Sequence, residues 1–272
     1  MKPYRNLKIQ SLAIATLFVV TSLIGIQFLP ALPVILVLAS LAVTGLSWRL
    51  FRALHQQIGE QEFNNFRQQE ALSGLYATLD IQHPLPRTRH TAASPDFLHF
   101  LANEIFRLRP RLIVEVGSGT STLIAAYCLK KIGGGKIISL DHLEKYADIT
   151  RDTLVSHQLQ NFAEVRFAPI KAYDIEGTKH PWYDDAKLTD CESIDLLIVD
   201  GPPKMLAEKA RYPAIPLLKD KLNPATIVLL DDGDRKAERQ IVELWRSEFS
   251  LEYHRIPTEK GAYSCYFRQP SE

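Results

Sequence analysis

The residues that could bind a ligand begin with the turn Gly117-Ser118-Gly119, which follows an apolar run. Glycines let the main chain approach a ligand closely, and a helix that starts after them offers unpaired N–H groups to acceptor atoms. The next apolar run ends at Asp141, 22 residues beyond Gly119. At that place a carboxylate hydrogen-bonds to ribose hydroxyls. Together these residues predict a nucleotide-type ligand, and a tight turn with a helix-capping Asp is the alternative.

Two neighbours of this turn bear on which cofactor it binds. A dinucleotide site prefers a third glycine, for close packing of helix on strand, where this chain has Thr122. Glu115 lies two residues before the first glycine. Its carboxylate would repel a pyrophosphate but suits the ammonium group of S-adenosylmethionine (SAM). The sequence therefore favours SAM, with a nicotinamide dinucleotide as the alternative.

Acidic residues follow two later apolar runs, at Asp200 and at Asp231-Asp232. Ligands collect at the carboxyl ends of strands in parallel sheets. Three carboxylates that converge there would repel one another unless a cation neutralised them, and oxygen ligands favour Mg²⁺ or Ca²⁺. Asp200, Asp231 and Asp232 are therefore candidate metal ligands. Alternatively, Asp232 caps a helix that starts near Arg235, and Asp200 only borders the cofactor.

Group transfer to oxygen or nitrogen needs a base besides close approach and alignment. Asp232 and Lys204 are the candidate bases, because each follows an apolar run that also ends in a candidate ligand. A lysine in that position is at least as often an exposed residue at a helix start. The segment Trp182-Tyr183-Asp184-Asp185 is a candidate acceptor lid, with plain aromatic packing as the alternative.

These residues must be positioned by the short apolar runs and amphipathic stretches that alternate after residue 76. Fully apolar strands between helices predict a parallel sheet that is covered on both faces. The last two strands are joined by the short turn 257–261 and should pair antiparallel. The expected strands are 112–116, 136–140, 164–167, 194–199, 226–230, 251–256 and 262–267, and the expected helices are 122–131, 145–158, 205–222 and 236–249.

The N-terminal part of the chain has a different composition, since Ile9–Trp48 contains no Asp, Glu, Lys, Arg or His. A membrane-spanning helix needs about 20 apolar residues, so the run has room for two spans. Pro30 and Pro33 divide it, because proline breaks a helix. We expect transmembrane helices over about 11–29 and 31–48. A signal peptide is the rival reading, but its apolar region is about 7–15 residues long.

Basic residues flank both ends of this predicted hairpin: Lys2, Arg5 and Lys8 before it, Arg49 and Arg52 after it. Positive charge marks the cytoplasmic side. The sequence therefore predicts an integral membrane protein whose remaining chain is cytoplasmic.

The composition divides the chain into three parts: an anchor over 1–48, a juxtamembrane amphipathic stalk over 49–76, and a catalytic domain over 77–272. A second copy of the chain is a candidate partner through the stalk, although its heptads are too few and irregular to predict a coiled coil.

The motifs Val114-Glu115-Val116-Gly117-Ser118-Gly119-Thr120 with Asp141, 194–203 and 231–232 together resemble those of the class I SAM-dependent methyltransferases. Residues 89–96 resemble a segment of the subgroup related to catechol O-methyltransferase. The resemblance spans about 90–267 and implies a Rossmann-like α/β fold, with a seven-stranded, mostly parallel sheet that ends in an antiparallel hairpin.

The resemblance also implies roles for single residues. Glu115 would face the methionine ammonium, Asp141 would hold the ribose and His142 would pack on the adenosine. The turn Gly117-Ser118-Gly119 and Asp200 would border SAM. In catechol-type relatives, acids at the ends of the fourth and fifth strands hold a divalent ion. This chain has Asp232 where an Asn is common.

We therefore predict methyl transfer from SAM to an acceptor, expected to be a hydroxyl, at the cytosolic face of a membrane, with Mg²⁺ as a candidate helper. The acceptor would be a small molecule, a glycan precursor or a lipid-linked compound. A nicotinamide-dependent oxidoreductase and a catalytically silent SAM-binding module are the alternatives. The net charge of +1, from 32 Lys and Arg against 31 Asp and Glu, argues against a nucleic-acid partner.

Overall fold

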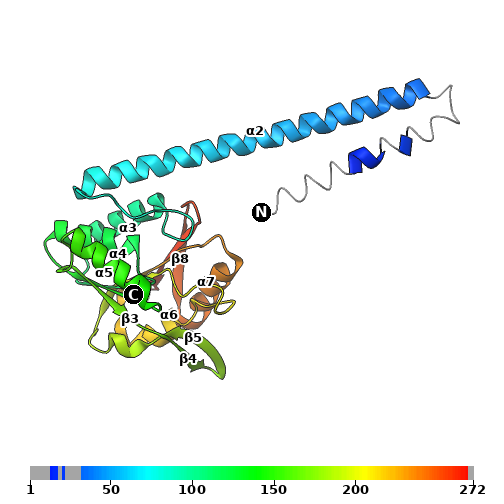
Figure 1. Ribbon diagram of the computed structural model, residues 1–272. Helices are drawn as coiled ribbons and strands as arrows, with labels where there is room; N and C mark the ends of the chain where they lie inside the picture. The colour runs from blue at the N-terminus through cyan, green and yellow to red at the C-terminus, as the bar shows by residue number, and fades with distance from the viewer. Residues whose placement is uncertain (1–12, 18–19, 22–31, 269–272) are drawn as a thin grey trace. The chain divides into compact units, whose positions relative to one another are not determined.

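The computed structural model describes residues 13–17, 20–21 and 32–268 of the chain. The chain forms two compact units, Met1–Asn65 and Phe66–Glu272, and each is described here by itself. Helix α2 (Leu32–Leu79) begins in the first unit and ends in the second (Figure 1).

The part of α2 that belongs to the first unit starts with an apolar stretch. Of the residues described, this is the one helix long and apolar enough to cross a membrane, by length and composition. No residue of 32–50 is buried in the protein. The prediction of two transmembrane helices is therefore not confirmed, since the first predicted span, 11–29, lies mostly outside the described residues. Helix α2 continues from the second predicted span into the predicted stalk without interruption.

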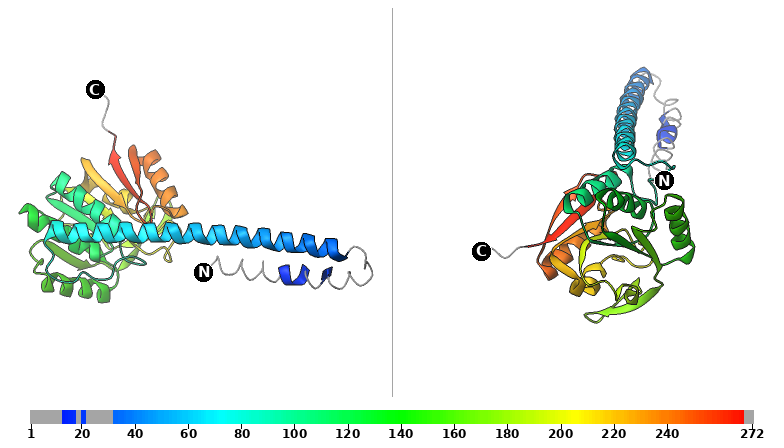
Figure 2. Two further views of the ribbon diagram at one scale, coloured as in Figure 1. Left: turned by 90° about the horizontal axis from the view of Figure 1, so that it is seen from above. Right: turned by 90° about the vertical axis from the view of Figure 1, so that its left-hand side faces the viewer.

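The second unit is built on a seven-stranded sheet with the order β3-β2-β1-β6-β7-β9-β8 (Figures 1 and 2). Strands β1, β2, β3, β6 and β7 are parallel, and β9 runs antiparallel to both β7 and β8. The predicted Rossmann-like sheet with a terminal antiparallel hairpin is thus confirmed. The strands are β1 (Leu112–Val116), β2 (Lys136–Asp141), β3 (Ala163–Phe167), β6 (Ile194–Val199), β7 (Leu222–Leu230), β8 (Leu251–Ile256) and β9 (Ala262–Phe267).

Helices cover both faces of the sheet because its strands are apolar on both sides. One core layer lies under α3 (Pro95–Leu108), α4 (Thr120–Ile132) and α5 (Glu144–Ser156), and includes Phe97 and Leu123. The other lies under α6 (Ala214–Leu218) and α7 (Lys236–Phe249), and includes Trp245. Leu75 and Leu79, at the end of α2, are buried in the first layer. The compact unit therefore begins at Phe66, eleven residues before the predicted boundary at 77.

Two local predictions fail for identifiable reasons. The expected helix over 205–222 is reduced to α6, followed by a short 3₁₀ turn, because Pro213 directly precedes α6 and disfavours a helix before it. An unpredicted two-stranded sheet, β4 (Ile170–Ile175) with β5 (Thr178–Tyr183), precedes β6. It buries Trp182 and Tyr183, each 1% exposed, so these aromatic residues pack in the core and do not form a lid.

The order of the strands places a crevice beside β1. The chain passes from β1 outward to β2 and β3, and then returns to place β6 on the other side of β1. When the loops after two adjacent strands run in opposite directions, they separate at the carboxyl ends of those strands. In open α/β sheets, ligands bind in the crevice that this leaves. The residues after β1, β2, β6 and β7 are therefore brought to one edge.

Candidate functional site

Main-chain contacts hold the glycine turn against the end of β6. Gly117 has a φ of +104°, and a Cβ on it would lie 3.1 Å from the carbonyl carbon of Asp200. A side chain at this position would therefore be strained and would press on the main chain. By contrast, a Cβ on Gly119 would meet no described atom within 4 Å. The second glycine thus faces open space, as a turn that admits a ligand requires.

Glu115 lies at the base of this turn, fully buried on β1. Ser139, its partner across β2, donates a hydrogen bond of 2.7 Å to Oε2, and the Thr122 hydroxyl donates to the same oxygen. The other oxygen, Oε1, accepts no hydrogen bond of ordinary geometry from the part of the chain that the structure describes, although the Ser121 hydroxyl lies close enough to stabilise the carboxylate. Burial raises the pKa of Glu115 to about 7, although nearby hydroxyl groups oppose the shift. Glu115 is therefore a buried acid with one oxygen left for a donor.

Asp141 ends β2 and is 5% exposed. Its Oδ2 accepts a hydrogen bond of 2.8 Å from Ser118 Oγ, and its Oδ1 accepts one of 3.0 Å from the main-chain N–H of Leu143. Each carboxylate oxygen has a second lone pair, so both can still accept from a ligand. His142 follows, half-buried, with its ring edge-to-face on Tyr183 at a centroid distance of 6.0 Å. The structure thus brings together the predicted cofactor residues from the ends of β1 and β2.

Tyr183 joins this group although the sequence pattern assigned it to a lid. It is fully buried, and its hydroxyl lies against Gly201, where a Cβ would collide with it. Gly201 is therefore required by the close approach of a tyrosine from β5. The pairing could not be read from the sequence because β4 and β5 were not predicted.

The predicted metal ligands Asp200, Asp231 and Asp232 also converge. One oxygen from each lies within 4.8 Å of the others. Asp231 is fully buried, and neither of its side-chain oxygens has a hydrogen-bond partner among the described residues. Burial, followed by the neighbouring negative charges, raises the pKa of Asp231. The sequence therefore located an acidic cluster correctly.

A residue that the sequence analysis missed, Arg211, already binds this cluster. Its guanidinium is 4% exposed. Nη2 donates to Asp200 Oδ1 at 3.0 Å and to Asp232 Oδ2 at 2.8 Å, and Nη1 donates to the carbonyl oxygen of Asp231 at 2.9 Å. Arg235 adds an ion pair of 2.7 Å to Asp232 Oδ2. No motif spacing marked Arg211, which lies in the segment wrongly expected to be a helix.

These contacts test whether the cluster suits a divalent ion. A metal would need oxygens of Asp200 and Asp232, and these two carboxylates already pair with two cations, Arg211 with both of them and Arg235 with Asp232. Asp200 Oδ1 and Asp232 Oδ2 are therefore already engaged in strong, charge-assisted hydrogen bonds. The residues present therefore do not fit the metal site that the resemblance implied.

The two predicted bases lie in different surroundings. Lys204 is exposed in the turn after β6. Asp232 is 4% exposed and has a positive φ of 58°. Its Oδ1 also lies 3.9 Å from Nζ of Lys260, a half-buried residue that the sequence analysis did not single out. Neither base assignment is tested by this geometry, and both stay predictions.

The segment 89–96 packs against the loop between β8 and β9. Asp96 accepts a hydrogen bond of 2.8 Å from the main-chain N–H of Glu259, and Lys260 Nζ donates to the carbonyl oxygen of Ala92 at 2.7 Å. Arg89 forms an ion pair with Glu259. One side of the carboxyl edge is thus closed by two segments far apart in the sequence.

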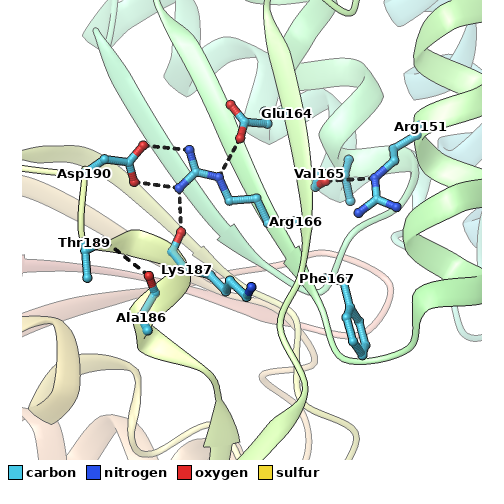
Figure 3. A pocket seen from close by; sticks show the side chains of 9 residues that line it. All are labelled: Arg151, Glu164, Val165, Arg166, Phe167, Ala186, Lys187, Thr189 and Asp190. Carbon is cyan, nitrogen blue, oxygen red and sulfur yellow. Dashed lines mark hydrogen bonds and ion pairs between the residues drawn. The ribbon is translucent and has the colours of Figure 1, made fainter.

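A surface hollow beside the edge strand β3 lies outside this group of residues (Figure 3). Arg166, at its centre, pairs with Asp190 at 2.6 Å and with Glu164 at 2.7 Å. Arg151 donates to the carbonyl oxygen of Val165 at 2.9 Å. Because these cations are already bonded to protein oxygens, the hollow gives no reason to place a ligand there.

Comparison with known proteins gives a family match within the second unit. Residues 114–233, which contain the glycine turn, Asp141 and the acidic cluster, match the family model described as a methyltransferase domain. This match lies entirely within the second unit and covers less than half of the chain. No curated protein matches the chain.

Solved structures of methyltransferases share the fold of the second unit. An SAH-bound methyltransferase of Podospora anserina is 14% identical with a TM-score of 0.54, over 73% of this chain and 88% of that one. An O-methyltransferase of Bacillus cereus in complex with SAH (S-adenosylhomocysteine) is 20% identical with a TM-score of 0.51. The match covers 73% of this chain and 91% of that one. At such identities the likeness shows the fold alone.

Proposed function

We propose that this chain transfers a methyl group from SAM to the hydroxyl oxygen of an acceptor. The methyltransferase domain match supports the reaction class. The two structural relatives were solved with SAH, the product that SAM leaves, and one is called an O-methyltransferase. The glycine turn, Glu115 and Asp141 lie near the carboxyl ends of β1 and β2, and this arrangement supports the proposal.

The observation that carries the proposal is the free oxygen of Glu115. Two hydroxyl donors occupy Oε2, while Oε1 is buried without a hydrogen bond of ordinary geometry from any residue described, the nearby Ser121 hydroxyl included. A buried acceptor left unpaired is unfavourable, by about 1–3 kcal/mol. The ammonium group of SAM would supply the missing donor and a compensating charge.

The residues at the carboxyl edge would then bind and orient the reactants. When bound, SAM supplies an electrophilic methyl group on a positively charged sulfur. The glycine turn lets the main chain approach the cofactor, and Asp141 offers two oxygens to ribose hydroxyls. As the acceptor oxygen bonds to the methyl carbon, the sulfur–carbon bond breaks and the sulfur keeps its electron pair. The hydroxyl proton passes to a base, for which Asp232 and Lys204 remain our predictions.

We further propose that α2 anchors the domain at the cytoplasmic face of a membrane. The apolar stretch of α2 is exposed within its own unit, and Arg49 and Arg52 follow it. An anchored enzyme suits a membrane-borne acceptor, such as a lipid-linked compound or a glycan precursor. Carbonate-resistant membrane association and protease access to the second unit from the cytoplasmic side would support this placement. Extraction by carbonate would contradict it.

The cofactor is tested by calorimetry on the full chain in detergent micelles, titrated in turn with SAH, SAM and NADH. We expect micromolar binding of SAH and SAM and none of NADH. Asp141→Ala should weaken SAH binding at least tenfold, whereas Asp152→Ala, at an exposed position on α5, should leave it unchanged. Absence of SAH binding by folded protein would refute the proposal, and NADH binding would favour the oxidoreductase alternative.

Transfer itself is tested with SAM labelled on the methyl group. Membranes that contain the chain should incorporate label into an extractable acceptor, and an acid- and base-stable product would identify an ether. Glu115→Ala protein, assayed at equal folded concentration, should lose the incorporation. Unchanged incorporation would exclude Glu115 from the cofactor site.

A further inference from the structure

We propose that Arg211 takes the place of a divalent cation among the strand-end carboxylates and positions Asp200 and Asp232 for the methyl transfer proposed above, which then needs no metal ion. What this proposal implies for the acceptor rests on that proposed function. What it implies for metal binding can be tested without it.

The first argument is the geometry of the guanidinium. One nitrogen, Nη2, bonds to a side-chain oxygen of Asp200 at 3.0 Å and of Asp232 at 2.8 Å. The same nitrogen also donates to the carbonyl oxygen of Asp200 at 2.8 Å. Nη1 adds the carbonyl oxygen of Asp231 at 2.9 Å. The ends of β6 and β7 are thus joined through a single side chain, as a shared metal ion would join them.

The second argument is competition for the same oxygens. Mg²⁺ binds oxygen at about 2.1 Å. An ion bound to Asp200 Oδ1 or to Asp232 Oδ2 would therefore lie within about 5 Å of Arg211 Nη2. Arginine stays charged at all relevant pH values. A dication at such a distance from a buried guanidinium would be repelled in a poorly screened environment. Metal binding at these two oxygens would therefore require Arg211 to leave its position.

The third argument is that Arg211 is held where it is. It is 4% exposed and lies in a tight turn, where the N–H of Ala214 bonds to its carbonyl oxygen at 3.2 Å. The next residue is also fixed, because Trp245 Nε1 donates to the carbonyl oxygen of Tyr212 at 2.9 Å. The guanidinium consequently belongs to the folded framework and is not a mobile surface group.

The inference narrows the acceptor class. An enzyme that holds its acceptor through a metal ion favours compounds that offer two neighbouring oxygens to that ion. With Arg211 as the resident cation, a single hydroxyl suffices. We therefore infer that the enzyme methylates acceptors with an isolated hydroxyl in addition to acceptors with two adjacent hydroxyls.

Metal binding gives the decisive test. The full chain in detergent micelles is titrated with Mn²⁺, and the free ion is measured by its electron paramagnetic resonance signal. Wild-type protein should show no site tighter than about 1 mM, the weak end of carboxylate sites. In the same samples SAH affinity should be equal with EDTA and with Mg²⁺. A one-to-one Mn²⁺ site that disappears in Asp231→Asn would overturn the inference, whereas failure of SAH to bind would refute only the proposed function.

Variants of Arg211 test the substitution directly. Arg211→Met should free the carboxylates and create a Mn²⁺ site, which the double variant Arg211→Met/Asp231→Asn should lack. Arg211→Lys retains a cation and should bind no Mn²⁺, which separates charge from a general effect on folding. Folded Arg211→Met without a Mn²⁺ site would contradict the role of Arg211 as a resident cation. Should that variant not fold, the wild-type measurement decides alone.

Discussion

The hydroxyl of Ser118 donates a hydrogen bond of 2.8 Å to Oδ2 of Asp141, which joins the glycine turn after β1 to the end of β2. A second bond of 3.0 Å, from the N–H of Leu143, fixes the other oxygen. Asp141 is therefore oriented before a ligand arrives. A ligand that bonds to this carboxylate does not have to order it, and such preorganisation improves affinity.

This relationship predicts that Ser118→Ala weakens SAH binding through Asp141. Loss of a hydrogen bond to a charged group corresponds to about 1.5–3 kcal/mol, so an affinity loss of about tenfold or more is expected. The double variant Ser118→Ala/Asp141→Ala should bind no worse than Asp141→Ala alone, because the two residues act as one unit. Calorimetry of the four proteins checks this, and additive losses would show that Ser118 contacts the ligand independently.

A second prediction concerns the contact between Tyr183 and Gly201. A Cβ at residue 201 would collide with the tyrosine hydroxyl, so Gly201→Ala should lower the free energy of unfolding by about 1–3 kcal/mol. Tyr183→Phe removes the hydroxyl and should reduce that loss to below about 1 kcal/mol. Chemical denaturation of both single variants and the double variant measures the coupling. If Gly201→Ala lowered the free energy of unfolding equally in wild-type and Tyr183→Phe protein, the strain would arise from another contact.

The fold was largely predictable because apolar strands between helices leave few arrangements of a parallel sheet. Strands β1, β6, β8 and β9 have the bounds that their apolar runs predicted. The prediction failed where proline overrode an amphipathic pattern, at Pro213, and where the short hairpin β4–β5 carried a weak alternation. The predicted anchor and stalk differ in composition but share the continuous helix α2, because a change of composition need not interrupt the backbone.

The candidate site was predictable to the extent that it follows strand ends. Glu115, Asp141 and Asp200 could be located because each lies at or just beyond a run that had to be a strand. Arg211 could not, since it reaches the cluster from a turn whose path depends on tertiary packing of Tyr212 and Trp245. The sequence showed that three carboxylates need a cation, but it did not show that an arginine supplies one.

A third prediction concerns the cysteines. Cys128, Cys191 and Cys265 are all buried, and burial raises the pKa of the Cys128 and Cys265 thiols to about 12. Because the thiolate is the reactive form, native protein at pH 7.5 should react very slowly with a thiol reagent. Denatured protein should release three equivalents, matching the three cysteines of the chain. Rapid labelling of native protein would indicate that a core layer opens locally.

The fourth prediction is a pH dependence of stability due to Glu115. Its pKa is about 7 in the fold against 4.5 for an ordinary glutamate. Between these values the folded state binds more protons than the unfolded state, so stability from this residue is lost as the pH rises through 7. The loss amounts to about 3 kcal/mol. Urea denaturation of wild-type and Glu115→Gln protein at pH 5 and pH 8.5 should show the variant gaining relative stability at the higher pH.

Ligand binding should reverse this effect, because an ammonium beside Oε1 would favour the ionised carboxylate. Near pH 6.5 the ligand-free protein holds its proton on Glu115, so SAH binding should release it. The heat of binding then varies with the ionisation enthalpy of the buffer in wild type, and stays constant in Glu115→Gln. Asp152→Asn serves as a charge-matched control and should keep the buffer dependence. A buffer-independent heat in wild type would mean that the ammonium does not meet Glu115, and the cofactor would have to bind with its amino group elsewhere.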